Sequence, residues 1–299
     1  MDNIYKNRDW LYTAYQTKKL SIHQIAKEVN AGSTTIWNWL YKFNIPTRSN
    51  QEGIHLVKGN HCNPSQEAKE WIDGELLGDG CLWSQNFYSA YFIYDSKYLE
   101  YTQYILDTLK SFGIEQSGKI NERKDKKWGN YSYRYCSYSY VELSPIRKRW
   151  YPNGKKIVPR DIKLTPLTCR QWYIGDGSLR HEKRAKSRII LATCGFPIND
   201  VEWLISQLNE LGFKATRRNS NNTIGISTHS TQNFLNYIGK CPVKCYQYKW
   251  NNEQEAQITE QKEEVYETET SEISVGRRKI WLEKEIWLKK SILIGRYRS

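Results

Sequence analysis

The sequence lacks any long hydrophobic run. No stretch of about 18 uninterrupted apolar residues, the length of a membrane-spanning helix, occurs among its 299 residues. The first ten residues, MDNIYKNRDW, also lack the apolar core of a secretory signal. We therefore expect a protein with no membrane partner that stays in a bacterial or phage-host cytoplasm or nucleoid, or in an organelle.

The sequence also has no CxxC pair. Its seven cysteines are odd in number, which argues against a disulfide framework and fits reduced thiols. Cys241 and Cys245 with His61 and Cys62 offer four zinc ligands, but their spacings match no common zinc module. We interpret the cysteines as ordinary packing residues.

Positive charge and flat aromatic side chains are abundant. The formal net charge is +13, and the chain contains 22 Tyr and 12 Trp. Cations that meet phosphates and rings that meet sugars or bases are typical of a nucleic-acid-binding surface. A host composition that favours Lys and Tyr would give the same numbers, so charge alone favours a nucleic-acid partner without establishing it.

Residues 1–49 carry three helical patterns, over 8–19, 21–29 and 33–43. Ser21 with Gln24 predicts a capping box, and Ser33 is a predicted cap for the third helix. We expect an all-α helix-turn-helix DNA-binding domain whose third helix enters a major groove, with a three-helix protein-interaction bundle as the alternative. Residues 50–66 follow as a linker. The predicted DNA-binding positions of the third helix are Thr34, Thr35, Trp37, Asn38 and Lys42.

Two short stretches, ELLGDGCL and YIGDGSL, repeat each other and place Asp79 and Asp176 97 positions apart. Each lies at the predicted end of a helix, where we expect Gly80 and Gly177 to adopt the left-handed conformation of a helix terminus. A carboxylate at the C-terminal end of a helix dipole gains no local stability. Its occurrence in both copies therefore points to chemistry.

Small residues on the two predicted helices allow close packing. Gly74 and Gly78 lie four positions apart, on one helix face, and Gly175 takes the place of Gly78 in the second copy. Backbone-to-backbone packing would bring the two aspartates together. Paired carboxylates repel unless a cation lies between them, and hard cations such as Mg²⁺ prefer oxygen ligands.

The segments around the motifs repeat in the same order. Each copy continues with a strand, a helix, an alternating segment, a short helix and a lysine, which is Lys156 in the first copy and Lys249 in the second. We therefore predict an α+β fold with two pseudo-symmetric halves, residues 67–160 and 161–250, that present antiparallel sheets.

The motifs WIDGELLGDG and RQWYIGDG, with their spacing and the trailing KKIVP and YKW, resemble a single-chain LAGLIDADG homing endonuclease. The resemblance covers roughly residues 67–250. It implies two αββαββα-like halves with saddle-shaped sheets, a long asymmetric double-stranded DNA target, and a monomer that cuts both strands with Mg²⁺. This chain departs from the pattern at Leu77 and Ile174, which are often acidic, and at Gln171, where a small residue is expected.

The resemblance also implies the roles of individual residues. Asp79 and Asp176 would bind metal and act in catalysis with Lys156 and Lys249, and phosphate anchoring is the alternative role for the two lysines. The predicted metal site includes Gly78 and Gly175, which with Gly74 also form the helix interface. Residues of the alternating segment that we expect to face DNA are Tyr133, Arg134, Tyr135 and Tyr138.

Other functions fit the same residues. A regulator of this fold that binds DNA without cutting it, or an intron maturase that binds structured RNA, are the alternatives to an intron-borne mobile endonuclease. Residues 251–299 read as an acidic spacer followed by a basic amphipathic helix, either a second copy of a binding helix or a C-terminal helix packed on the core.

Overall fold

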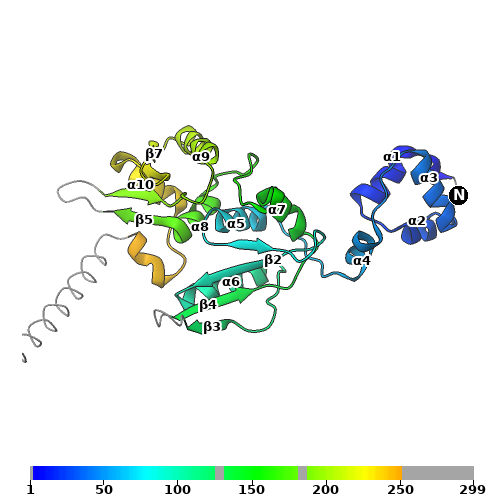
Figure 1. Ribbon diagram of the computed structural model, residues 1–299, viewed down its shortest axis with the longest axis horizontal. Coiled ribbons are helices and arrows are strands. Elements are labelled where there is room, and N and C mark those ends of the chain that lie inside the picture. The colour runs from blue at the N-terminus through cyan, green and yellow to red at the C-terminus, as the bar shows by residue number, and fades with distance from the viewer. Residues whose placement is uncertain (1–2, 125–130, 181–186, 251–299) are drawn as a thin grey trace, which may run out of the picture. The chain divides into compact units, whose positions relative to one another are not determined.

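The computed structural model describes residues 3–124, 131–180 and 187–250 of the chain (Figure 1). The spacer and amphipathic helix predicted over residues 251–299 lie outside this part. Across the described ranges, no helix is long and apolar enough to cross a membrane. The fold is α+β, as the sequence predicts, with a helical N-terminal module followed by two repeated halves.

The N-terminal module is helical and has its own apolar core. Side chains from three helices, including Leu11, Ile25, Ile36 and Leu40, are fully buried together. Burial of such side chains stabilises short helices that would be marginal alone. The elements are η1 Ile4–Lys6, α1 Arg8–Tyr12, η2 Thr13–Thr17, α2 Ile22–Glu28 and α3 Ser33–Lys42.

The predicted helix caps of this module are correct for α2 and incorrect for α3. The capping box of α2 is confirmed, because the Gln24 amide donates to Ser21 Oγ at 3.1 Å and the Ser21 amide donates to Gln24 Oε1 at 2.8 Å. The prediction for Ser33 is wrong: the N-cap of α3 is Gly32 and Ser33 is the first helical residue. Asn30, in the turn between α2 and α3, has φ of 50°, a conformation that Asn tolerates better than most residues.

A further helix, α4 Asn50–Lys58, occupies most of the predicted linker. The Ser49 side chain accepts a hydrogen bond from the Glu52 amide at 3.2 Å, so Ser49 is the N-cap of this helix. The sequence analysis predicted a linker here because glycine and polar residues are typical of loops.

Each of the two halves has the order αββαββα. In the first half, β1 and β3 are the edges of a four-stranded antiparallel sheet of order β1-β2-β4-β3, and in the second half the order is β5-β6-β8-β7. The identical topology confirms that the chain repeats internally. The first half comprises α5 Gln66–Leu77, β1 Cys81–Trp83, β2 Tyr91–Ser96, α6 Leu99–Ser111, β3 Asn121–Lys124, β4 Tyr131–Cys136 and α7 Leu143–Trp150, followed by η3 Pro152–Gly154. The second comprises α8 Pro166–Asp176, β5 Gly177–Arg180, β6 Arg188–Leu191, α9 Ile198–Glu210, β7 Ala215–Arg218, β8 Thr223–Ile226 and α10 Thr228–Ile238, followed by η4 Lys244–Lys249.

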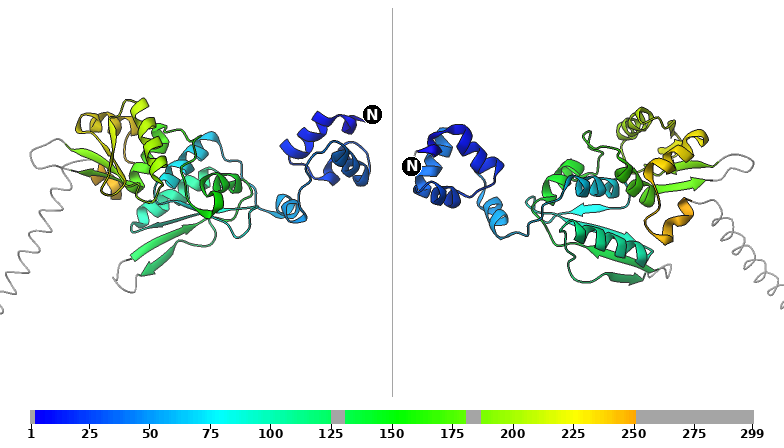
Figure 2. Two further views of the ribbon diagram at one scale, coloured as in Figure 1. Left: turned by 45° about the horizontal axis from the view of Figure 1, so that its top comes forward. Right: turned by 180° about the vertical axis from the view of Figure 1, so that it is seen from behind.

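Helices cover one face of each sheet. In the first half α6 lies along β2 and β4 (Figures 1 and 2), and Phe92, Tyr94 and Tyr135 on that face are at most 1% exposed. The second half repeats this packing with Ile189, Ile224 and similar side chains beneath its helices. The opposite face of each sheet carries the more polar alternate residues, as strand periodicity requires.

Candidate functional site

The two motif helices, α5 and α8, pack against each other through their glycines (Figure 1). A Cβ atom placed on Gly78 would lie 3.3 Å from the Gly175 Cα, and one placed on Gly175 would lie 3.2 Å from the Asp79 amide nitrogen. The helix backbones therefore touch where the motifs end. Because each aspartate follows its motif glycine directly, Asp79 and Asp176 emerge from the same junction.

Gln171 fits into this interface because Gly74 lies opposite. A Cβ on Gly74 would approach Gln171 Cβ to 2.8 Å and the Thr168 carbonyl oxygen to 2.6 Å. The buried Gln171 amide donates to Tyr104 Oη at 2.9 Å. The large residue in the second motif is thus accommodated by the missing side chain in the first.

The expected left-handed conformation of Gly80 and Gly177 is wrong. Neither residue is among the described positions with positive φ, and Gly177 has φ of −86° and ψ of 150°. Glycine is required at both positions by close approach instead: a Cβ on Gly80 would lie 2.7 Å from the Glu75 carbonyl oxygen, and one on Gly177 would lie 2.4 Å from the Tyr173 carbonyl oxygen.

Both aspartates have access to solvent. Asp79 is exposed and Asp176 is partly exposed, whereas the residues that precede them in their helices are mostly buried. The buried helices fix the backbone, and the carboxylates lie where a polyanionic substrate and its cations could approach.

Lys156 lies at the end of the first motif. Its Nζ donates to the carbonyl oxygens of Gly78 and Gly80, each at 3.1 Å. Burial lowers the pKa of Lys156, while the negative groups around it, among them Asp176 and Asp79, oppose that shift. This lysine therefore belongs to the same charged cluster as both aspartates.

A third acid, which the sequence analysis did not single out, lies beneath this cluster. Glu75 is 1% exposed and accepts a hydrogen bond from Tyr101 Oη at 2.6 Å. Burial, together with the nearby charge of Asp79, raises the pKa of Glu75 to about 8, and the hydrogen bond from Tyr101 partly opposes this rise. Its position four residues before Asp79 on a buried helix was the available signal.

Lys249, the corresponding lysine of the second copy, lies in η4 and is 7% exposed. Its Nζ lies 4.9 Å from the centroid of the Tyr246 ring. These two residues belong to a second compact unit that begins at Tyr246.

The acidic residues suit a hard divalent cation. Within the described ranges no three His, Cys, Asp or Glu side chains cluster as a metal site, including the His61 and cysteine set. Mg²⁺ commonly binds through one or two carboxylates, with waters and substrate phosphates completing its shell, so two aspartates at one junction are sufficient. The Gly78 carbonyl, which we placed in the predicted metal site, accepts from Lys156 in this structure, so the carboxylates are the better ligands.

The prediction for the DNA-facing residues of β4 is partly wrong. Tyr135 is completely buried beneath α6, and strand alternation puts Tyr133 on the same helix-facing side. Arg134 lies on the opposite, open face, where it pairs with Asp95. Tyr138, beyond the strand, is 48% exposed. The alternation was correct, but the sequence did not show which face the helix covers.

The predicted reading helix α3 presents the expected side chains. Thr34, Trp37, Asn38 and Lys42 are exposed and Thr35 is partly exposed. The Trp37 ring stacks on the exposed Tyr41 ring, with centroids 5.7 Å apart. This outer face of α3 combines hydroxyl, amide, ammonium and aromatic groups suited to base edges or phosphates.

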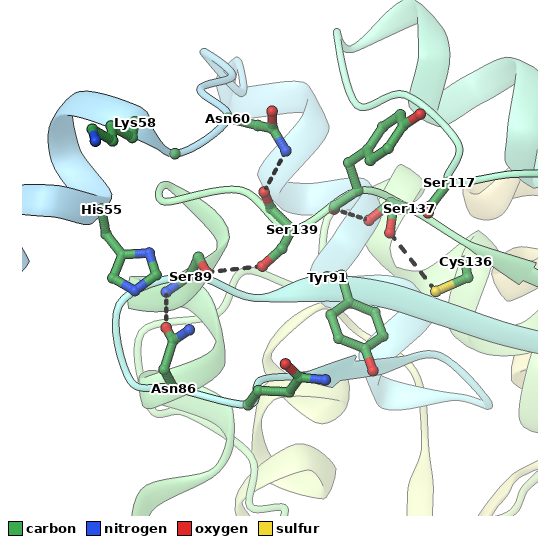
Figure 3. Close-up of a pocket in the computed structure, with 13 residues that line it drawn as sticks. His55, Lys58, Asn60, Asn86, Ser89, Tyr91, Ser117, Cys136, Ser137 and Ser139 are labelled. Carbon is green, nitrogen blue, oxygen red and sulfur yellow. Dashed lines mark hydrogen bonds between the residues drawn. The ribbon is translucent and has the colours of Figure 1, made fainter. Parts of the chain in front are cut away.

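A polar cavity adjoins the open face of the first sheet (Figure 3). Its volume is about 470 Å³, and no Asp or Glu is among the described residues that line it. Ser139 lies between Asn60, which donates to its carbonyl oxygen at 3.1 Å, and Ser89, whose hydroxyl lies 2.9 Å from its own (Figure 3). With Lys58 at its rim, this cavity offers donors and cationic charge to an anionic ligand.

Comparison with known proteins agrees with this arrangement. The model of the LAGLIDADG DNA endonuclease family matches residues 69–234, which is more than half of the chain. An uncharacterized protein of Methanocaldococcus jannaschii is 27% identical over 211 residues, covering 67% of this chain and 77% of that protein. The cytochrome b mRNA maturase bI2 of Debaryomyces hansenii is 35% identical over 78 residues, covering 25% of this chain and 28% of the maturase.

One of the similar solved structures shares the fold with a TM-score above 0.5. The homing endonuclease I-WcaI bound to its DNA recognition sequence superposes with a TM-score of 0.55 at 21% identity, covering 70% of this chain and 96% of that one. I-DmoI in complex with DNA and Mn gives a TM-score of 0.37 at 16% identity, covering 57% of this chain and 97% of that one. The family match spans both motif helices and both sheets, so this chain belongs to the LAGLIDADG DNA endonuclease family.

Proposed function

We propose that this protein is a site-specific homing endonuclease that hydrolyses one phosphodiester in each strand of a DNA duplex with a divalent cation, Mg²⁺ in the cell. The observation that carries the proposal is the junction of α5 and α8, where Asp79 and Asp176 emerge side by side and both act electrostatically on Lys156. One acid from each half suits two cuts related by the internal repeat.

Within that junction each group has a distinct task. A bound cation would lower the pKa of a water and neutralise charge on the scissile phosphate, and Asp79 and Asp176 are the residues that would hold it. Lys156, fixed by the Gly78 and Gly80 carbonyls, is placed to stabilise negative charge that develops on the phosphate. Lys249 is our proposal for the equivalent role in the second half.

The N-terminal module would add contacts to the same target. We infer that α3 acts as the second helix of a helix-turn-helix, because its exposed face carries the polar and cationic side chains described above. Both motif helices come from one chain, so a monomer would suffice to cut a long asymmetric site.

Cleavage of a plasmid tests the proposal. The substrate would be a supercoiled plasmid that carries the gene's own locus with the insertion removed, incubated with Mg²⁺. The expected result is one discrete double-strand cut by the natural protein and none by Asp79→Asn or Asp176→Asn. Asp107→Asn makes the same change on the exposed side of α6 and should cut normally. Full cleavage by Asp79→Asn would refute the catalytic assignment.

A second candidate function, RNA maturation, is favoured by the partial likeness to the Debaryomyces hansenii maturase. Splicing of the host intron in vitro with and without the protein distinguishes the two. Stimulated splicing without DNA cleavage would favour the maturase, and sequence-specific binding without either activity would favour a regulator.

A further inference from the structure

Arg134 and Asp95 form an ion pair on the open face of the first sheet. The two residues are direct partners in the β2–β4 register, so their side chains project from the same face. Their neighbours in the strands, Tyr94 and Tyr135, point the other way, into the core beneath α6. The pair therefore lies on the side of the sheet that none of the described helices covers, with its side chains 31% and 40% exposed.

The pair fixes the plane of the guanidinium group. Arg134 Nε donates to Asp95 Oδ1 at 2.7 Å, and Nη2 donates to Oδ2 at 2.5 Å. This side-on contact uses two of the five N–H donors of an arginine. The edge formed by Nη1 and the second Nη2 hydrogen faces away from the carboxylate, and the described residues supply no other hydrogen-bond partner to it.

Stability alone gives a weak reason for this pair. An exposed ion pair contributes little to folding because solvent screens it. A carboxylate on a surface that meets a polyanion also repels that polyanion. Asp95 is therefore an unfavourable residue on this face unless its effect on Arg134 compensates.

Orientation supplies that compensation. The open edge of a guanidinium presents two parallel N–H groups, which match the O6 and N7 acceptors of guanine in the major groove. Holding the side chain in one orientation beforehand reduces the entropy that binding must remove. We propose that Asp95 is a positioning residue that holds Arg134 to read one guanine in the half-site bound by the first sheet. The proposal rests on the proposed function only in taking duplex DNA as the ligand.

The second half provides a matched control. Arg217 on β7 pairs with Glu202 on α9, where Nε donates to Oε1 at 2.5 Å. Chemically this is the same kind of pair, but it joins a strand to the helix that covers it. It lies on the helix-covered face of its sheet, so breaking it with Glu202→Ala should leave base preference unchanged.

The test is selection of bound sequences by the full chain. The probe is a pool of duplex oligonucleotides with a randomised central segment. The protein binds the pool in the presence of EDTA, which prevents metal-dependent cleavage, and the bound oligonucleotides are then recovered and sequenced. We expect a guanine in the consensus of the natural protein whose preference falls by about 5- to 150-fold in Asp95→Ala and Arg134→Ala, with the other positions retained. Arg134→Lys should show the same loss with nearly unchanged affinity for random DNA, since lysine keeps the charge without the fork.

Several outcomes would overturn the inference. These are an unchanged consensus in Asp95→Ala, a retained guanine in Arg134→Lys, or no consensus at all for the natural protein. Arg134→Lys decides the matter if Asp95→Ala does not fold. If the natural protein does not cut the plasmid but Asp95→Ala and Arg134→Ala still lose the guanine preference, the endonuclease proposal is refuted and this inference stands. If the natural protein cuts the plasmid but the two variants keep the guanine preference, this inference alone is refuted.

Discussion

Replacing Gly74 with alanine should separate the motif helices. The added Cβ would lie 2.6 Å from the Thr168 carbonyl oxygen, 2.8 Å from Gln171 Cβ and 3.0 Å from Thr168 Cα. Two of these three atoms belong to the α8 backbone, so rotation of a side chain cannot relieve the clash. The helices must move apart, and the aspartates at their ends move with them.

The size of the effect follows from two opposing terms. Overpacking of a tight interface costs about 1–3 kcal/mol, and the better helix propensity of alanine returns about 0.5–1 kcal/mol. The free energy of unfolding should therefore fall by up to about 2.5 kcal/mol. Cleavage should fall more steeply than stability, because displacement of catalytic groups by about 1 Å can cost on the order of 100-fold in rate.

Gly53→Ala is the matched control. Gly53 lies inside helix α4, and nothing is within 4 Å of a Cβ placed there. This variant should be neutral or slightly more stable in thermal and urea unfolding, and it should cut DNA normally. If Gly74→Ala and Gly53→Ala had the same stability and activity, the backbone contact between the motif helices would not be as tight as described.

Three further predictions concern charge and thiols. The pKa of Glu75 rises from 4.5 to about 8 on burial, so between these pH values the native state holds a proton that the unfolded chain releases. The free energy of unfolding should therefore fall as the pH rises from about 4.5 to about 8. Glu75→Gln should flatten this pH dependence in urea unfolding. Lys42→Ala should weaken binding to all DNA sequences and reduce the slope of log K against log salt by about 1, whereas an unchanged slope would remove α3 from the interface. A thiol reagent at mildly alkaline pH should label the exposed Cys194 before Cys62, whose pKa burial raises to about 12; peptide mass spectrometry would contradict this if Cys62 reacted first.

The sequence by itself determined the architecture. The duplicated Gly-Asp-Gly motifs, with the same order of strands and helices after each, predicted two α+β halves, and both sheets have the predicted repeat. It also predicted the packing of α5 on α8, because Gly74 and Gly78 leave one face of α5 without side chains and Gly175 lets the two backbones approach at the ends of the helices. These features follow from local spacing, which a single chain displays directly.

The tertiary structure decided which groups face each other. Alternation along β4 separates Arg134 from Tyr135, but only the packing of α6 shows that Tyr135 is the buried one. Asp95 is 39 residues from Arg134 in the chain, and only strand pairing makes them partners. Gly80 likewise is glycine because the backbone of Glu75 is close, and not because of its own dihedral angles. Contacts between distant segments depend on how elements pack, and local spacing carries no record of them.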